Sequence, residues 1–148
     1  MEGLGAAASI IAVVDLSAKI ASICSQYIKD VKNAENDVRR LLQEVKNLHA
    51  IAEDIKGLLS GPHSARLKSS QKLEAGLKDS SHKLQTLEKK LEGLEQKLRP
   101  GGTRHKIKAR LGLTALRWPL SSQEVEKDVQ DIASYKQTLS LALQQDHL

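Results

Sequence analysis

The sequence predicts an all-α fold, a helical bundle of four long helices plus one short basic helix. Three observations favour it. Along four long segments, apolar residues recur at alternating spacings of three and four, as on one face of a helix. Glycine, proline and serine gather between these segments, where such residues end helices. No segment alternates apolar and polar residues as a half-buried strand does. At 148 residues, the chain is expected to form one domain spanning residues 1–148.

The first predicted helix runs from Gly3 to Val31, and its first half is apolar or small on every side. Between Gly3 and Cys24 the only charged residues are Asp15 and Lys19. The apolar stripe of the second half consists of Leu16, Ile20, Ile23, Tyr27 and Val31. The opposite stripe is polar and continues backwards into small residues: Gln26, Ser22, Lys19, Asp15, Ala12, Ala8 and Gly5. A helix that is apolar all round needs a buried or lipid environment, so we expect the other helices to cover this one.

The second and third predicted helices carry apolar stripes with heptad spacing. Asn33 is a candidate cap for the second helix, and Ser60-Gly61-Pro62 ends it. Its stripe is Val38, Leu41, Val45, Leu48, Ala52, Ile55 and Leu59. The third helix is expected to begin near Ser64 or a few residues later and to end at Pro100. Its stripe is Leu73, Leu77, Ser80, Leu84, Leu87, Leu91, Leu94 and Leu98. We expect both stripes to pack in a mostly antiparallel bundle.

A short basic helix is predicted for residues 104–117, followed by a long helix from about Ser122 to Gln145. Pro119 biases the preceding residue away from helical geometry, which separates the two helices. Ser121 and Glu124 have the spacing of a capping box at the start of the last helix. The apolar face of that helix is Val125, Val129, Ile132, Leu139 and Leu143.

The net charge of +5 is concentrated in the middle of the chain. Residues 1–60 carry a net charge of −1, residues 61–118 carry +9, and residues 119–148 carry −3. No acidic residue separates Glu95 from Glu124. The basic residues from 104 onwards are candidates for binding anionic lipid headgroups: Arg104, Lys106, Lys108, Arg110 and Arg117. A solvated charged loop and helix is the alternative. Nucleic-acid binding is disfavoured, because no aromatic residues alternate with these charges for base stacking.

Trp118 has two interpretations, and we favour the first. It fills one end of the bundle core, or it anchors the chain at a membrane interface, where tryptophan is enriched. Cys24 lies beside Ile23 near the apolar face and is expected to be a buried small hydrophobe in a chain without a disulfide. Nothing in the sequence supports an enzyme or a cofactor. No two histidines have metal-ligand spacing, so no metal site is expected either.

The segment from Gly3 to Cys24 would span about 33 Å as a helix, long enough to cross a bilayer only if its two charges were tolerated. Glu2 stands where a signal peptide would have a basic region, so neither a signal peptide nor a constitutive membrane span is expected. A conditional span remains open.

The chain resembles the HeLo-like N-terminal domains of fungal NOD-like (STAND-type) receptors over nearly its whole length. The resemblance lies in the small, apolar opening from Gly3 to Val14, its continuation to Val31, and the segment Val38–Leu59. The run Leu116-Arg117-Trp118-Pro119-Leu120 before the last helix adds to it. It implies a helical bundle that acts in programmed cell death and innate immunity. Such a domain would be cytoplasmic at rest, and would oligomerise and attack the plasma membrane when a receptor or amyloid signal releases it.

On this reading the first helix is the membrane-active element. The residues expected to insert are Gly3, Leu4, Gly5, Ile10, Ile11, Val13, Val14 and Leu16. The residues expected to face neighbouring copies or a pore are Ala8, Ala12, Asp15 and Lys19. Two alternatives stay open. Asp15 would simply pair with Lys19 one turn on, on the solvated face of a bundle helix. The whole domain would be a soluble protein–protein adaptor that does not act on lipid.

Overall fold

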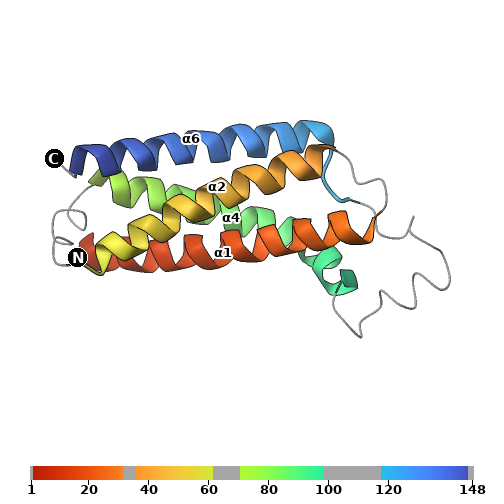
Figure 1. Cartoon of the computed structure of the whole chain (residues 1–148), viewed down its shortest axis with the longest axis horizontal. Coiled ribbons are helices and arrows are strands. Elements are labelled where there is room, and N and C mark those ends of the chain that lie inside the picture. The colour runs from red at the N-terminus through yellow and green to blue at the C-terminus, as the bar shows by residue number, and fades with distance from the viewer. Residues whose placement is uncertain (1, 32–35, 62–70, 99–117, 147–148) are drawn as a thin grey trace.

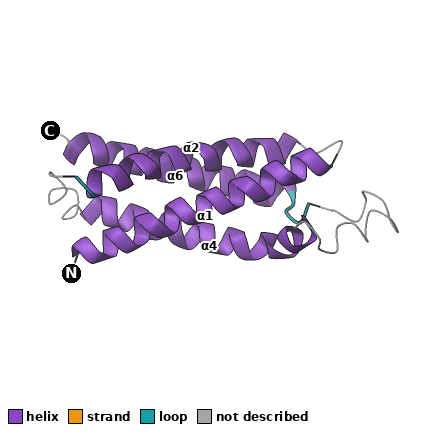
Figure 2. Cartoon of the chain, turned by 60° about the horizontal axis from the view of Figure 1, so that its bottom comes forward, coloured by secondary structure: helices purple, strands orange, loops and turns teal. Residues whose placement is uncertain are grey.

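The computed structural model describes residues 2–31, 36–61, 71–98 and 118–146, which form four long α-helices with no strand among them. The helices are α1 (Glu2–Asp30), α2 (Asn36–Leu59), α4 (Gln71–Leu98) and α6 (Ser122–Asp146). They lie along the long axis of the molecule, side by side (Figures 1 and 2). The all-α helical bundle of four long helices is therefore confirmed. The short basic helix expected at residues 104–117 falls outside the described residues.

The four helices form a ring in which each one contacts two neighbours. α1 packs against α2 and α4, and α6 packs against the same two helices, so α1 and α6 occupy opposite corners. The expectation that the other helices cover α1 is confirmed for α2 and α4 and is wrong for α6. α6 does not contact it, and the outer side of α1 stays open to solvent, where Ile11 is 51% exposed.

Two of the four neighbouring pairs run parallel. In α2 and α6, Arg40 pairs with Glu126, and Glu44, one turn further along, pairs with Lys136, so both helices advance in the same direction. α1 and α4 also run the same way along the bundle (Figure 1). The expected mostly antiparallel packing is thus wrong for half of the pairs. The reason is that α2 and α4, which follow each other among the described helices, occupy opposite corners of the ring.

The core is built from the apolar stripes that the sequence predicted. α2 buries its whole stripe: Val38, Leu41, Val45, Leu48, Ala52, Ile55 and Leu59. α4 buries every stripe residue whose side chain is described: Leu73, Leu77, Ser80, Leu84, Leu87, Leu91 and Leu94. α6 buries Val125, Val129, Ile132 and Leu139, and Leu143 packs against them partly buried. Heptad spacing keeps one side of each helix turned inward over its full length, which is why the stripes meet in one core.

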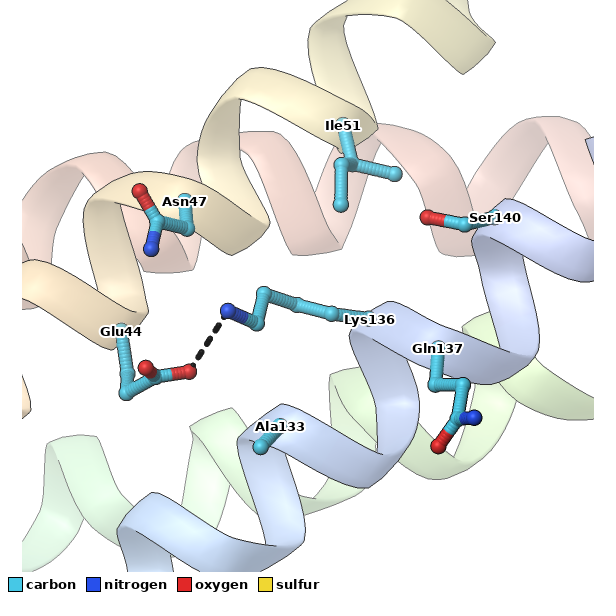
Figure 3. A pocket seen from close by; sticks show the side chains of 7 residues that line it. All are labelled: Glu44, Asn47, Ile51, Ala133, Lys136, Gln137 and Ser140. Atoms are coloured by element: carbon cyan, nitrogen blue, oxygen red, sulfur yellow. Dashed lines mark ion pairs between the residues drawn. The ribbon is translucent and has the colours of Figure 1, made fainter.

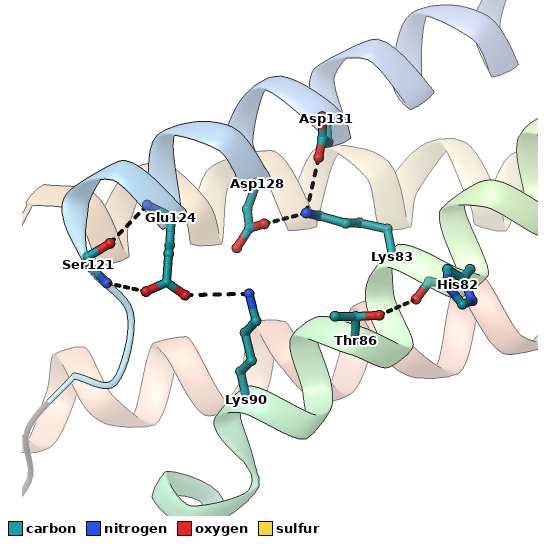
Figure 4. Close-up of polar contacts among 8 residues, drawn as sticks. All are labelled: His82, Lys83, Thr86, Lys90, Ser121, Glu124, Asp128 and Asp131. Atoms are coloured by element: carbon teal, nitrogen blue, oxygen red, sulfur yellow. Dashed lines mark hydrogen bonds and ion pairs between the residues drawn. The ribbon is translucent and has the colours of Figure 1, made fainter.

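The start of α6 has the predicted capping box (Figure 4). The backbone N–H of Glu124 donates to Ser121 Oγ at 3.1 Å, and the backbone N–H of Ser121 donates to Glu124 Oε1 at 3.3 Å. Two N–H groups at the helix start that lack partners within the helix are satisfied in this way. The cap fixes where α6 begins and so where its apolar face meets α2 and α4.

Charged side chains also join α4 to α6 (Figure 4). Lys83 Nζ of α4 lies 2.5 Å from Asp128 Oδ1 and 3.0 Å from Asp131 Oδ2. Asp128 is a charged residue inside the bundle, with a side chain only 4% exposed. A buried carboxylate is costly without a partner, so Lys83 is required where it stands. About two turns beyond Lys83, Lys90 and Glu124 form a second, more exposed pair at 3.4 Å.

Trp118 packs at the end of the bundle, as its favoured interpretation predicted. Its ring centroid lies 5.2 Å from that of Tyr27, with the rings tilted by 50°. The indole is partly buried against the core, and Leu120 beside it is buried. Trp118 therefore covers the last turns of α1 and is a core plug in this state of the molecule.

Candidate functional site

The inward side of α1 buries most of the residues expected to enter a membrane. Ile10, Val13 and Val14 are buried in the core, and Leu16 packs against it partly buried. The remaining members, Gly3, Leu4 and Gly5, lie within the helix, but only their backbone is described. Of the members with a described side chain, only Ile11 is exposed. The apolar surface of α1 is thus sheltered, as expected of a resting state, because exposed apolar surface of that size promotes association.

The stripe expected to face neighbouring copies lies together on the outer side of α1. Ala8 and Asp15 are exposed, and Ala12 and Lys19 are partly exposed. The spacing of four, three and four residues places these side chains above one another along the helix. Small side chains at such positions allow two helices to approach closely. The bundle therefore leaves this stripe accessible while it covers most of the described side chains that are expected to insert.

Lys19 is held by α4, which corrects one of the alternatives. Its ammonium lies 3.6 Å from Glu88 Oε1 and 3.5 Å from Glu95 Oε2. Among the described residues no ion pair joins Lys19 to Asp15, so the local pair one turn apart is wrong for this state. The physical reason is that α4 packs directly beside α1. Glu88 and Glu95 stand two turns apart on one side of α4, and both reach the same cation.

Ser17 makes a contact with α2 that was not predicted from the sequence. Its side chain is fully buried, and its hydroxyl donates to the Val14 carbonyl at 3.1 Å. The same oxygen lies 2.9 Å from His49 Nδ1 of α2, and His49 Nε2 lies 3.4 Å from Glu53 Oε1. One feature of the sequence pointed to this contact: Ser17 is a polar residue on the side of α1 opposite Asp15 and Lys19. A hydroxyl that is buried there needs a hydrogen-bond partner. The side chain of His49 is 30% exposed.

Cys24 is buried in the core on the same side of α1, as predicted. Its exposure is 0%, and burial raises the pKa of the thiol to about 12. A thiol with that pKa stays protonated near neutral pH and is a poor nucleophile. Cys24 therefore contributes to packing, which agrees with its interpretation as a small hydrophobe.

α1 is also the one helix in the described part of the chain that is long and apolar enough to cross a bilayer. The qualifying segment is Ala7–Asp30, by length and composition alone. The core helix of a soluble protein meets the same criteria, so the segment fits both a bundle helix and a membrane-spanning helix. The residues expected to bind headgroups, Arg104, Lys106, Lys108, Arg110 and Arg117, lie outside the described residues and are not located by the structure.

One groove in the described part of the bundle contains an ion pair. The groove between α2 and α6 has a volume of about 370 Å³ and is lined by Glu44, Asn47, Ile51, Ala133, Lys136, Gln137 and Ser140 (Figure 3). Its two charged groups neutralise each other, with Lys136 Nζ 2.7 Å from Glu44 Oε1. Within the described ranges, no three His, Cys, Asp or Glu side chains could hold a metal ion. The first helix remains the strongest candidate site.

The described part of the chain is an all-α bundle of four helices, and its first helix is both part of the core and, by length and composition alone, able to cross a bilayer. The chain belongs to the family described as "Pigment biosynthesis cluster protein PigL N-terminal", whose model matches residues 1–148. Comparison with curated proteins and with solved structures gave no match. The family is therefore known, but these comparisons assign no activity to the chain.

Proposed function

We propose that the chain is a HeLo-like effector domain of a fungal NOD-like receptor system, which oligomerises and permeabilises the plasma membrane through α1. It is cytoplasmic at rest, and an upstream receptor or amyloid-signalling partner sends it to anionic phospholipid. In this proposal it is not an enzyme, uses no cofactor and has no nucleic-acid partner.

The observation that carries the proposal is the position of α1. A helix long and apolar enough to span a bilayer sits at one corner of the ring, against two helices and not three. Its apolar side chains, such as Ile10, Val13 and Ile20, are sheltered in the bundle. Lipid tails are about as apolar as a leucine core, so these side chains exchange one apolar environment for another when α1 inserts.

Asp15 is the main obstacle to insertion of a single helix. An intramembrane carboxylate costs about 2.5–3.5 kcal/mol by insertion scales. In an oligomer, the stripe of Ala8, Ala12, Asp15 and Lys19 would face neighbouring helices or a water-filled centre, which avoids this cost. The accessibility of Ala8 and Asp15 in the resting bundle supports such self-association.

A specific observation also favours the second candidate, a soluble adaptor. The bundle itself uses the apolar residues of α1, since Val13 and Ile20 are fully buried against other helices. A protein–protein module needs nothing more than this packing. The two candidates differ in what happens when lipid is added.

The test is dye release from vesicles, with anionic lipid in one set and only zwitterionic lipid in the other. The proposal expects release from the anionic vesicles and much less from the zwitterionic ones, because net +9 lies in residues 61–118. Circular dichroism and a melting curve verify that the protein is folded in both samples. Folded protein that binds neither vesicle and releases no dye would rule out the effector and leave the adaptor.

A further inference from the structure

Ser17 and Lys19, which lie within one helical turn of α1, each make a polar contact with a neighbouring helix. Ser17 meets His49 of α2, and Lys19 meets Glu88 and Glu95 of α4. In the half of α1 that precedes this turn, the described contacts with the core are apolar, as at Ile10, Val13 and Val14. In the turn at residues 17–19, α1 is therefore linked to α2 by a hydrogen bond and to α4 by ion pairs.

The polar contacts of α1 differ from its apolar ones in whether a membrane can replace them when α1 separates from the bundle. Burial of Val13 or Ile20 is recovered in lipid, so it scarcely distinguishes the bundle from a membrane-inserted helix. The ion pairs of Lys19 have no counterpart in hydrocarbon, because Glu88 and Glu95 remain on α4. A conformational equilibrium shifts only through interactions that differ between its states. The ion pairs therefore favour the bundle-bound position of α1 over the separated one.

We propose that Lys19, Glu88 and Glu95 form an electrostatic clasp that keeps α1 on the bundle and so restrains the domain before activation. Its role as a restraint rests on the proposed function, but the clasp itself is a property of the soluble protein. Lys19 is 41% exposed on its side chain, so the clasp is open to the ionic strength of the solution and to competing anions. Anionic lipid headgroups are anions of that kind, and would displace both carboxylates from Lys19 at the membrane surface.

The experiment is hydrogen exchange of the α1 amides in solution without lipid. Glu88→Gln combined with Glu95→Gln removes both charges while keeping side-chain size. The clasp predicts exchange of the α1 amides that is roughly threefold to tenfold faster than in wild type, the range expected for two partly exposed ion pairs. Glu126→Gln is the matched control, because it breaks the Arg40–Glu126 pair between α2 and α6, a pair in which no residue of α1 takes part. It should leave α1 exchange at the wild-type rate.

Charge reversal supplies the second arm. Lys19→Glu alone should accelerate α1 exchange, and adding Glu88→Lys and Glu95→Lys should slow it again. Rising salt should speed α1 exchange in wild type and have less effect on the double glutamine variant. Unchanged α1 exchange in the double glutamine variant would overturn the clasp, whatever the protein does to vesicles. Faster exchange without any dye release would keep the clasp and reject the membrane function.

Discussion

Tyr27 of α1 and Trp118 pack ring against ring, with centroids 5.2 Å apart and a tilt of 50°. The contact joins the last turns of the first helix to the chain just before the last helix. Tilted aromatic pairs add about 0.5–1.5 kcal/mol beyond their area burial. Among the described residues, no acceptor lies within hydrogen-bonding distance of the indole Nε1, so the ring acts through packing.

Trp118→Ala should therefore lower the free energy of unfolding by about 2–4 kcal/mol, through lost burial and an unfilled space. Trp118→Phe is the control, since it keeps a ring against Tyr27 and removes the buried N–H. It should lose much less stability. Urea unfolding followed by circular dichroism measures both. A Trp118→Ala midpoint equal to that of wild type would show that the ring is not part of the core.

Lys83 and Lys90 offer a matched pair of lysines on α4, both bound to acids of α6. Lys83→Met leaves Asp128 charged and almost fully buried, and breaking a buried pair in this way costs about 3–5 kcal/mol. Lys90→Met breaks a pair that is nearly half exposed, which is worth at most about 1 kcal/mol. Thermal melting should show a large loss for the first variant and a small one for the second. Equal losses would contradict the difference in burial.

The capping box predicts a specific sensitivity to acid. The hydrogen bond from the Ser121 backbone N–H, with Lys90 nearby, lowers the pKa of Glu124 below its ordinary value of 4.5. A carboxyl whose native pKa is depressed stabilises the fold fully above its unfolded value, and this contribution is lost as the pH falls through the native pKa. Melting curves between pH 7 and pH 2 should thus fall less steeply below about pH 4.5 in Glu124→Gln than in wild type. Parallel curves would refute this contribution.

The sequence predicts which face of each helix turns inward, but it does not predict which helices lie next to one another. The stripe from Val38 to Leu59 follows from spacing alone, because a helix turns the same residues inward whatever lies opposite. The spacing does not encode which helix lies opposite, so the sequence could not place α1 and α6 at opposite corners. Lys19 shows the same limit. Asp15 was the nearest acid in the chain, but the ring order supplied Glu88 and Glu95 from α4.

Of the candidate site, the membrane-length segment and its charge-poor half were predictable from composition. Ser17 was not identified, since its role depends on His49 reaching it from α2. Trp118 had two interpretations, a core plug and an anchor at a membrane interface, because an amphipathic ring suits either place. Only its packing against Tyr27 distinguished them.

The basic segment leads to a prediction about lipid selectivity. Changing Lys106, Lys108 and Arg110 to Glu should lower binding to anionic vesicles, because each basic residue near such a surface contributes about 1 kcal/mol. Added salt should weaken wild-type binding in the same direction, since the Debye length is only about 8 Å at physiological ionic strength. Vesicle co-sedimentation measures both, with circular dichroism as the check on folding. Equal binding of wild type and variant at low salt would reject headgroup recognition by this segment.

The most direct test of membrane entry by α1 uses the two large hydrophobic residues that the described part of the bundle leaves exposed. Ile11 on α1 is 51% exposed and Leu141 on α6 is 50% exposed, so Ile11→Glu and Leu141→Glu should each melt close to wild type. Only Ile11 belongs to the helix proposed to insert, where a charge costs about 2.5–3.5 kcal/mol. The measurement is dye release from anionic vesicles by the three proteins at equal concentration. Membrane entry by α1 predicts strong loss of release for Ile11→Glu and wild-type release for Leu141→Glu. Wild-type release by a folded Ile11→Glu protein would contradict it.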